Sequence, residues 1–463
     1  MKKFEDKSKN VKIAYIGGGS RGWAWGLMSD LAVCEKLCGE IALYDIDYEA
    51  AYHNEIIGNQ VKDVKGCKSA WRYRAVSTIK EALTGADFVV ISIQPATFKE
   101  MGSDVHTPEK YGLYQSVGDT TGPGGIIRAL RTIPMYEVIG HAIRDYSPNA
   151  WVINYTNPMT VCVKTLYRVF PKIKAFGCCH EVFGTQKLLA KVLDEMCGIK
   201  DITRPEIKVN VVGVNHFTWL TEAHYKNIDI FPIYRAFVEK FKDSGYTKGK
   251  DNNWMNNTFA CSDKVKMDLF RRYGVIAAAG DRHLAEFCPG YWYLESPEKV
   301  KEWGFGLTPI TQRTESLKNR LARSERLRNG EEKFEFKETG EDGVKQMCAL
   351  LGIADLKTNV NIPNIGQIPN MPYGAVVETN AYFSDDSVRP VMAGNLPESI
   401  YALVNRIAGE QECIVEAGLT RNLELAFEAF VNDPLVYIPL ADARKLFDEM
   451  IDNTKEYLGE YFE

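Results

Sequence analysis

The first third of the chain alternates short apolar runs with stretches of amphipathic, helix-like periodicity. The apolar runs, each about the length of one strand, are Val11–Ile16, Ile41–Tyr44, Phe88–Ile93, Trp151–Asn154, Lys174–Gly177 and Ile207–Val214. Strands without polar alternation, separated by helices, are typical of a parallel sheet with helices on both faces. The last run leads into the rest of the chain. We therefore predict a doubly wound parallel α/β domain in residues 1–200 and an α+β domain in residues 201–463.

Three stretches of the second part have patterns of their own. Glu315–Asp342 is densely charged and predicts a solvated helix followed by a loop, with a mobile flap over a site as the alternative. Asn361–Tyr373 is rich in Pro, Asn and Gly and predicts a loop, and loops of this kind often border functional sites. Leu396–Ala417 predicts a long helix with apolar faces.

The first apolar run ends in a glycine-rich turn at the start of a helical stretch. Gly17 permits the tight turn, Gly19 lets the backbone approach a pyrophosphate, and Gly22 lets the helix pack closely on the strand. The free amides of this turn, which includes Ser20, would face the phosphates. The second run ends in Asp45, where an acidic residue binds the ribose of NAD and repels the phosphate of NADP. The pattern predicts an NAD site, and a glycine turn without a ligand is the alternative.

Composition narrows the class of protein. The 463 residues are 45% hydrophobic and 25% charged, which is typical of a globular enzyme, and the net charge of -5 offers no basic surface for nucleic acid. Met1–Lys7 lacks the apolar core of a signal peptide, and no run reaches the roughly 18 apolar residues of a membrane span. Eleven scattered cysteines indicate reduced thiols rather than a disulfide scaffold. We expect a cytoplasmic protein with no membrane partner.

A cysteine and a histidine follow two successive apolar runs. Cys179 comes just after the run that ends at Gly177, and His216 comes just after the run that ends at Val214. Ligands of doubly wound sheets gather at the carboxyl ends of the strands, so the two side chains could converge from neighbouring strand ends. A thiolate and an imidazole together can bind a metal ion. Both residue types are also common in protein cores, so the spacing alone leaves a structural role open.

Further motifs connect these residues to a known family. They are the blocks Gly118–Gly125, Ala129–Pro134, Asn154–Met159 and Gly280–His283. Together with the glycine turn, these blocks resemble glycoside hydrolase family 4, the NAD- and metal-dependent glycosidases. Members of the family carry a four-residue signature that begins at the metal-binding cysteine and differs between substrate groups. Here it is Cys179-His-Glu-Val182, which resembles the α-galacturonidases.

The resemblance implies a fold, two cofactors and a mechanism. The family fold is similar to lactate and malate dehydrogenases, and the cofactors are NAD and a divalent ion, usually Mn²⁺, with Cys179 and His216 as its protein ligands. Sulfur and imidazole favour softer ions such as zinc, so manganese follows from the resemblance alone. In the implied reaction the α-galacturonide is oxidised at C3 and loses its C2 proton to a base. The aglycone then leaves C1 with help from a general acid, water adds, and the sugar is reduced again.

The resemblance also assigns the acid and the base. Asp281 occupies the position where α-glycosidases of the family carry the base, and Tyr273 is the second candidate. A structural alternative is that Asp281 caps a helix that begins after Gly280, because Asp is a preferred N-cap. His180 occupies the position of the general acid, a role open to an imidazole with a pKa near neutral.

Three residues are candidates for substrate contacts. Asn157 resembles the family asparagine that contacts sugar hydroxyls, with Asn154 as the weaker candidate, and Asp119 could bind the sugar or the nicotinamide ribose. The carboxylate of a uronide calls for a cation, for which Arg282 is a candidate. Arg282 could equally be the structural partner of the adjacent aspartate. Glu181 would repel a uronic acid and could instead orient His180 or an arginine.

Other functions remain open at this level. Within the family, the alternatives are an α-galactosidase and an α-glucuronidase. Outside the family, they are an NAD-dependent dehydrogenase of a secondary alcohol, which would accumulate NADH, and a regulator that binds NAD without catalysis. Family members form dimers and tetramers, so we expect a homodimer or homotetramer.

Overall fold

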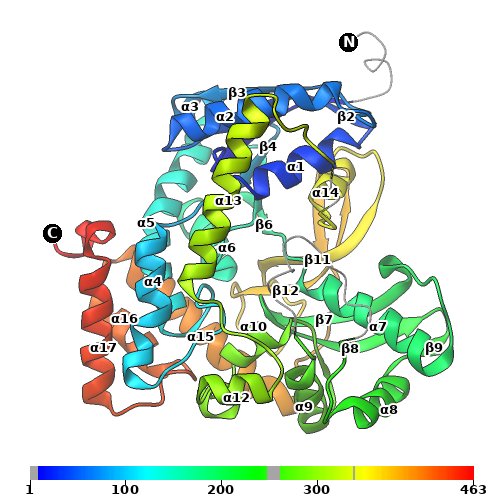
Figure 1. The fold of residues 1–463 in the computed structure, drawn as a ribbon, viewed down its shortest axis with the longest axis vertical. Coiled ribbons are helices and arrows are strands. Elements are labelled where there is room, and N and C mark those ends of the chain that lie inside the picture. Colours follow the sequence, from blue (N-terminus) through cyan, green and yellow to red (C-terminus); the bar gives the residue numbers. More distant parts are fainter. Residues whose placement is uncertain (1–8, 248–260, 337–338) are drawn as a thin grey trace.

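The computed structural model describes residues 9–247, 261–336 and 339–463. Among these residues, nine strands form one sheet in the order β13-β12-β11-β6-β5-β4-β1-β2-β3 (Figure 1). The parallel strands are β1 (Lys9–Ile16), β2 (Leu37–Tyr44), β3 (Trp71–Val76), β4 (Phe88–Ile91), β5 (Trp151–Asn154) and β6 (Lys174–Gly177). The predicted stretch Met1–Lys7 lies outside the described residues.

The parallel strands form the predicted doubly wound sheet. Ile13 of β1 lies between Ile41 of β2 and Phe88 of β4, and the spatial order 3-2-1-4-5-6 reverses direction between β1 and β4. Apolar side chains of both faces are buried, which explains why the strands show no polar alternation. The helices of this part are α1 (Trp23–Ala32), α2 (Tyr48–Gln60), α3 (Ile79–Leu83), α4 (Phe98–His106), α5 (Gly122–Tyr146), α6 (Met159–Val169) and α7 (Glu181–Cys197).

The second part of the chain extends the same sheet. Strand β11 (Leu356–Pro363) pairs antiparallel with β6, and it is followed across the sheet by β12 (Val376–Ser384) and β13 (Ser387–Pro390). Residue 200 therefore divides the chain in sequence but does not divide the sheet in space. The loop expected at Asn361–Tyr373 begins later than predicted, because its first three residues belong to β11.

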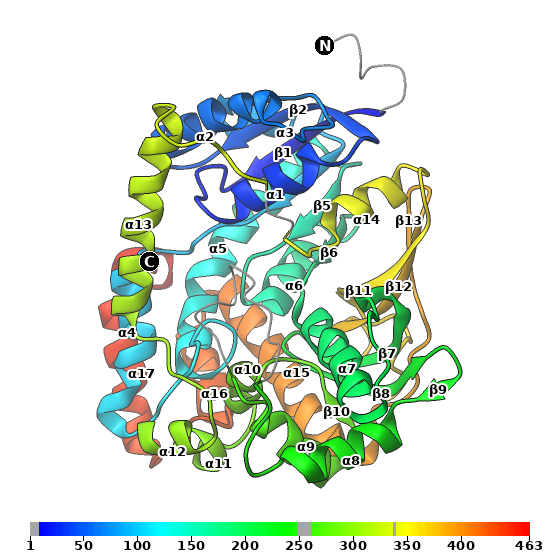
Figure 2. The ribbon, with the colours of Figure 1, turned by 45° about the vertical axis from the view of Figure 1, so that its right-hand side comes forward.

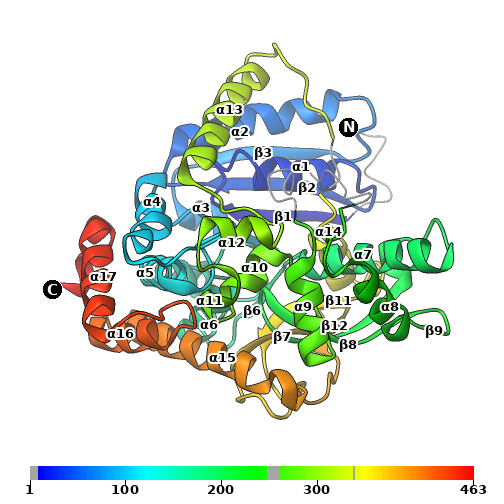
Figure 3. The ribbon, with the colours of Figure 1, turned by 60° about the horizontal axis from the view of Figure 1, so that its bottom comes forward.

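A second, antiparallel sheet carries the rest of the C-terminal part. It contains β7 (Ile207–Val214), β8 (Phe217–Tyr225), β9 (Ile228–Asp229) and β10 (Ile276–Ala277). Figure 3 shows α7, α8 and α9 close to this sheet. The remaining helices are α8 (Phe231–Phe241), α9 (Lys264–Tyr273), α10 (Asp281–Glu286), α11 (Gly290–Tyr293), α12 (Pro297–Glu302), α13 (Ile310–Arg328), α14 (Gly343–Leu350), α15 (Glu398–Leu419), α16 (Leu423–Asn432) and α17 (Leu440–Asn453).

Helix α15 confirms the predicted long apolar helix, with bounds shifted by two residues at each end. It packs against α5, and a Cβ atom at Gly418 would lie only 2.4 Å from Ile133, so this crossing requires glycine. Helices α15, α16 and α17 all pack against α5, and α15 also contacts β7 of the second sheet (Figure 1).

The charged segment expected to form a solvated helix forms α13, which lies alongside α2 and α4 (Figure 2). Its first backbone N–H donates to His106 Nε2 at 3.1 Å. At its other end, Glu325 and Arg328 contact the two ring nitrogens of His53 at 3.5 and 2.8 Å. Helix α13 is thus held by contacts near both of its ends. The alternative of a mobile flap stays a prediction, and residues 337–338 of the charged segment lie outside the described part.

No helix in the described residues combines the length and the apolar character that crossing a bilayer requires.

Candidate active site

A cavity of about 1260 Å³ lies at the carboxyl ends of the parallel strands. This is the edge at which open α/β sheets bind ligands. Among the residues predicted for the site, those that line the cavity are Gly17, Gly19, Ser20, Gly22, Asp45, Asp119, Asn157, His180, His216, Asp281 and Arg282. The structure therefore brings the dinucleotide turn and most of the predicted catalytic residues to one cavity.

The glycine turn has the geometry that a dinucleotide requires. Gly17 has a φ of +94°, and a Cβ atom there would lie 2.0 Å from the carbonyl oxygen of Ser92. A Cβ atom at Gly19 would lie 2.5 Å from the Cβ of Ala50. Neither position accepts a side chain, so the backbone itself lines the cavity.

Asp45 lies beside this turn at the end of β2. Its carboxylate accepts hydrogen bonds from the backbone N–H groups of Gly19, at 2.8 Å, and Asp47, at 3.0 Å. Burial raises the pKa of Asp45 above its ordinary value. The next residue, Ile46, is 95% exposed and lines the cavity, where it offers an apolar surface to an adenine ring. These features fit NAD.

The loops that carry Cys179 and His216 are joined, but the two residues do not follow neighbouring strands of one sheet; His216 lines the cavity, and Cys179 is not among its lining residues. Cys179 follows β6 of the large sheet, whereas His216 lies in the β7–β8 turn of the second sheet with a φ of +64°. Buried Glu378 joins the two loops: it accepts hydrogen bonds from Asn215 at 3.1 Å and from Asn359 at 2.6 Å. The same amide of Asn359 donates to the carbonyl oxygen of Cys179 at 3.3 Å. The prediction that Cys179 and His216 follow neighbouring strands of the same sheet was therefore wrong.

A chain of hydrogen bonds orients His216. Its Nδ1 lies 3.1 Å from the hydroxyl of Thr120, and that hydroxyl donates to Asp119 at 2.8 Å. Because the hydroxyl proton is used on Asp119, Nδ1 carries the ring proton and Nε2 keeps its lone pair. Burial and the nearby ring of His283 lower the pKa of His216 to about 3, which keeps the ring neutral. A neutral imidazole with a free Nε2 is the form that binds metal ions.

The surroundings of Cys179 also suit a cation. The thiol is buried, and burial raises its pKa well above the ordinary value, with Glu378 and Glu181 adding to the effect. A coordinating thiol must lose its proton, and a divalent cation supplies the positive charge that allows this here. The residues therefore fit a divalent metal ion held by one sulfur and one nitrogen.

His180 is paired with a residue that the sequence did not point to. Its Nδ1 lies 2.6 Å from a carboxylate oxygen of Glu341, which follows α13 in the chain. Burial lowers the pKa of His180, but the charge and the hydrogen bond of Glu341, together with the charge of Glu181, outweigh burial and raise the pKa to about 9. His180 itself lines the cavity.

Glu181, in the Cys179–Val182 signature, contacts the Gly280–His283 block. It accepts a hydrogen bond from the backbone N–H of Gly280 at 2.8 Å and lies 3.8 Å from His283 Nε2. The ring centroids of His283 and His216 are 3.9 Å apart. Burial opposes ionisation of Glu181, but the three nearby histidines, His283 first, lower its pKa to about 2. His180 forms its ion pair with Glu341. Glu181 therefore does not orient His180 through a direct contact.

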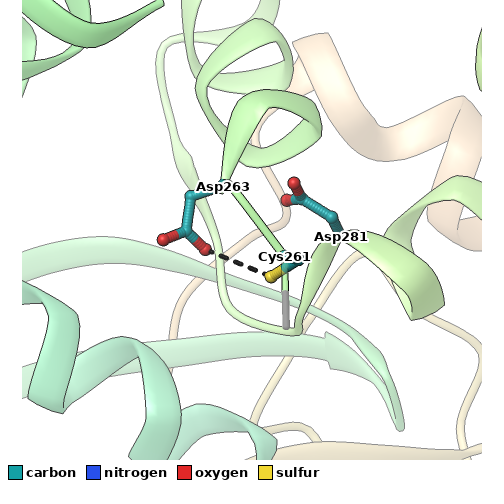
Figure 4. Close-up of side chains that lie close together, drawn as sticks. All are labelled: Cys261, Asp263 and Asp281. Carbon is teal, nitrogen blue, oxygen red and sulfur yellow. Dashed lines mark hydrogen bonds between the residues drawn. The ribbon is translucent and has the colours of Figure 1, made fainter. Parts of the chain in front are cut away.

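Asp281 is fully buried at the start of α10. Its carboxylate does not cap α10; it accepts hydrogen bonds from the N–H groups of Val265, at 3.3 Å, and Lys266, at 3.1 Å, in the first turn of α9. The suggested capping of its own helix was therefore wrong. Figure 4 shows Asp281 beside Cys261 and Asp263, and one ligand atom from each of the three lies within 4.8 Å of the others.

The structure separates Tyr273 from Asp281. Tyr273 is the last residue of α9, whereas Asp281 binds the first turn of that helix. The ring of Tyr273 packs edge-on against Trp219, with centroids 5.9 Å apart, and Tyr273 is not among the residues that line the cavity. Of the two candidates for the base, only Asp281 faces the cavity.

The two candidate asparagines differ in the same way. Asn154 is fully buried; it accepts a 2.5 Å hydrogen bond from Tyr136 and donates to the carbonyl of Thr156 at 3.0 Å. Asn157 lines the cavity, and its buried Oδ1 has no hydrogen-bond partner within the described residues. Asn157 is thus the one available to a ligand.

Arg282 lines the cavity, but two of its donors bind backbone. Its Nε donates to Gly306 at 3.0 Å and its Nη2 donates to Ser116 at 2.5 Å. Burial lowers its pKa to about 9. Two of its donors therefore hold the segments that precede α13 and α5 in place.

Comparison with known proteins identifies the family. The model of the family 4 glycosyl hydrolases matches residues 12–195, and the model of their C-terminal domain matches residues 211–436. This chain belongs to glycosyl hydrolase family 4. Among its family 4 relatives, a protein of Thermoanaerobacterium saccharolyticum named alpha-galacturonidase is 62% identical over 99% of this chain and 98% of its own length. A Bacillus subtilis protein of the same name is 52% identical over 95% of this chain and 97% of its own.

Solved structures of family 4 share the fold. The crystal structure of the protein lplD from Bacillus subtilis is 52% identical, with a TM-score of 0.90, over 95% of this chain and 99% of that chain. A 6-phospho-alpha-glucosidase from gut microorganisms, solved in complex with NAD and Mn²⁺, is 21% identical with a TM-score of 0.79. It covers 97% of this chain and 99% of its own. The predicted fold class, with a doubly wound sheet and a C-terminal α+β part, is confirmed.

Proposed function

We propose that this family 4 enzyme is an α-galacturonidase that uses NAD and a divalent metal ion, with Mn²⁺ as the first choice. The observation that carries the proposal is the 62% identity, over 99% of the chain, to a relative named alpha-galacturonidase. The Cys179-His-Glu-Val182 signature, whose His180 and Glu181 line the cavity, supports the same substrate group.

Two sets of residues would hold the cofactors. The glycine turn from Gly17 to Gly22 and Asp45 would bind NAD, and Cys179 and His216 would bind the metal ion. When bound, NAD serves as hydride acceptor and donor, and the ion stabilises negative charge on the sugar oxygens. Asn157 and Asp119 line the same cavity and would position the sugar hydroxyls.

Asp281 is our candidate for the base that removes the C2 proton. Its carboxylate lines the cavity, and the two backbone N–H groups of α9 hold it in one orientation. Such fixed geometry brings a base within reach of one particular proton and lowers the entropy cost of the transfer.

His180 is our candidate for the general acid. The contact with Glu341 fixes one ring nitrogen, so the proton on Nε2 remains for the glycosidic oxygen as it leaves C1. Once it has given up this proton, the same ring could accept a proton from the water that adds afterwards.

We also propose that the enzyme works in the cytoplasm as a homodimer or homotetramer. All eleven cysteines lie in the described part of the chain and none forms a disulfide, which fits a reducing compartment. Light scattering of the purified protein would measure the number of subunits.

The first test is release of p-nitrophenol from p-nitrophenyl α-D-galacturonide by reduced protein stripped of cofactor. We expect release only when NAD and Mn²⁺ are both added back, without net formation of NADH. No release from the galacturonide, with release from the α-galactoside or the α-glucuronide, would reject the substrate. Release without NAD would reject the mechanism.

A further inference from the structure

Helix α13 presents two arginines to the cavity. The residues of α13 that line it are Gln312, Arg313, Ser316, Leu317 and Arg320. Spacings of three, four and seven residues place these side chains on one face of the helix. Seven residues correspond to about 10 Å along the axis, so Arg313 and Arg320 reach different parts of the cavity.

Arg320 and Arg21 both line the cavity, and Arg21 belongs to the glycine turn. Burial lowers the pKa of Arg320, and the charges of Arg313 and Arg21 lower it further. Arg313 lies two helical turns before Arg320 in α13.

The contacts of Arg313 place it at the substrate end. Its Nη2 donates to the carbonyl of Val117 at 3.1 Å, two residues before Asp119. Asp119 is linked through Thr120 to His216, the candidate metal ligand. A pyranose whose C2 and C3 hydroxyls face His216 carries its C6 carboxylate on the opposite edge of the ring, which leaves that group free to reach a cation on the cavity wall.

A second arginine, Arg128, faces the same region and is only 4% exposed. Its Nε donates to the carbonyl of Asn157 at 3.0 Å and its Nη2 donates to Gln94 at 3.4 Å. Its Nη1 and the Nε of Arg313 are buried, and neither has a hydrogen-bond partner within the described residues. Buried donors are almost always satisfied, so these two point to an acceptor supplied by a ligand.

Three arginines, Arg128, Arg313 and Arg282, line the cavity, and the charge of Asp119 acts on all three. Within residues 9–247, 261–336 and 339–463, no carboxylate oxygen lies within 4.0 Å of a side-chain nitrogen of Arg128 or Arg313. A carboxylate from a ligand would supply the acceptor that their buried N–H groups lack.

We propose that Arg313 and Arg128 together bind the C6 carboxylate of the galacturonide and so distinguish it from a galactoside. The inference rests on the proposed function, because a uronide is the substrate that carries this group. In this proposal Arg313 and Arg128 take the role for which Arg282 was the candidate, because the Nε and Nη2 of Arg282 donate to backbone carbonyls. Two guanidinium groups with free N–H donors can each form a charge-assisted hydrogen bond to one carboxylate.

The test compares two substrates and one matched control. Arg313→Met and Lys318→Met remove one positive charge from the same helix, but Lys318 is exposed and does not line the cavity. With NAD and Mn²⁺ bound, we expect Arg313→Met to lower kcat/KM for p-nitrophenyl α-D-galacturonide by about 10- to 150-fold, mainly through KM. The value for p-nitrophenyl α-D-galactoside should change little. Lys318→Met should leave both values unchanged, and Arg313→Lys should retain part of the preference.

Two calorimetric titrations of the same proteins separate the outcomes: free D-galacturonate and D-galactose are added to the loaded proteins, and NAD is added to the proteins stripped of cofactor. Weaker binding of galacturonate with unchanged binding of galactose supports the inference, even if the wild-type enzyme fails to hydrolyse the galacturonide and the proposed function falls. Equal losses for both sugars overturn the inference. A loss confined to NAD also overturns it and assigns Arg313 to the dinucleotide phosphates.

Discussion

The Nδ1 atom of His180 lies 2.6 Å from a carboxylate oxygen of Glu341, whose side chain is only 5% exposed. The two residues are far apart in sequence and meet at the wall of the cavity. Glu341 is thus a positioning residue for the candidate general acid, and its effect should depend on how much the leaving group needs a proton.

Replacing Glu341 by Ala should therefore affect poor leaving groups most. We expect kcat for methyl α-D-galacturonide to fall by about 100-fold, because acid catalysis contributes that much or more when the departing oxygen is a strong base. The p-nitrophenyl substrate, which leaves as a stabilised anion, should lose much less. Steady-state kinetics on both substrates is the measurement. Glu335→Ala, an exposed position nearby, is the control, and equal losses on both substrates would argue against this role.

Replacing Cys179 by Ser should abolish activity that depends on metal while leaving NAD binding intact. The hydroxyl does not ionise as a thiol does beside a cation, so the ion loses its sulfur ligand. Fluorescence titration with NAD and p-nitrophenol release would measure the two properties. Cys197→Ser, at an exposed cysteine, is the control. Near wild-type turnover in Cys179→Ser would remove the thiolate from the mechanism.

Replacing Glu378 by Ala should weaken metal binding, although Glu378 is not one of the candidate metal ligands. The change leaves Asn215 and Asn359 without their common acceptor and so loosens the loops that carry His216 and Cys179. Outer residues of this kind typically change metal affinity by about 10- to 100-fold. Titration with Mn²⁺ would measure the Kd. An unchanged Kd in a folded variant would show that the two loops do not need this bridge.

Replacing Glu286 by Gln should remove a pH dependence of stability. Burial raises the pKa of Glu286 from 4.5 to about 7, so between these values the folded state keeps a proton that the unfolded state releases. The free energy of unfolding therefore falls as pH rises through this window, by roughly 3 kcal/mol for this group. Gln keeps an oxygen to accept the N–H groups of Val117 and Gly118, now both bound to Oε1.

Urea unfolding at pH 5 and pH 8, at constant ionic strength, tests this prediction. The stability of Glu286→Gln relative to wild type should increase between the two pH values, because all other groups titrate alike in both proteins. A difference that stays constant with pH would mean that Glu286 is ionised in the folded protein at pH 5.

Much of the parallel sheet could be predicted because each strand is a local apolar run. The bounds expected for β5, β6 and β7 agree with the structure. Strand β3 was missed: Trp71–Val76 is an edge strand in which Arg72 and Arg74 interrupt the apolar pattern. The place of β11 beside β6 could not be predicted, because it depends on pairing between segments about 180 residues apart.

The candidate site shows the same limit. Residues within a short motif, such as Cys179 and His216, could be named as candidates because their neighbours in sequence mark them. Glu341 and Arg313 stand in a densely charged segment that reads as solvated, and only packing shows that Glu341 is buried and that one face of α13 lines the cavity. Glu378 stands in β12 between Val377 and Thr379 and carries no local signal of its role.

The shared sheet limits how this protein can be divided or rearranged. Strand β6 pairs with β5 on one side and with β11 on the other, so a fragment that stops near residue 200 would expose one side of β6 as an unprotected edge. Such a fragment would lack β11 to β13 and would be prone to pair with other chains. Exchange of the N-terminal half between family members, as in chimeric enzymes, should therefore succeed only when β11 to β13 travel with it.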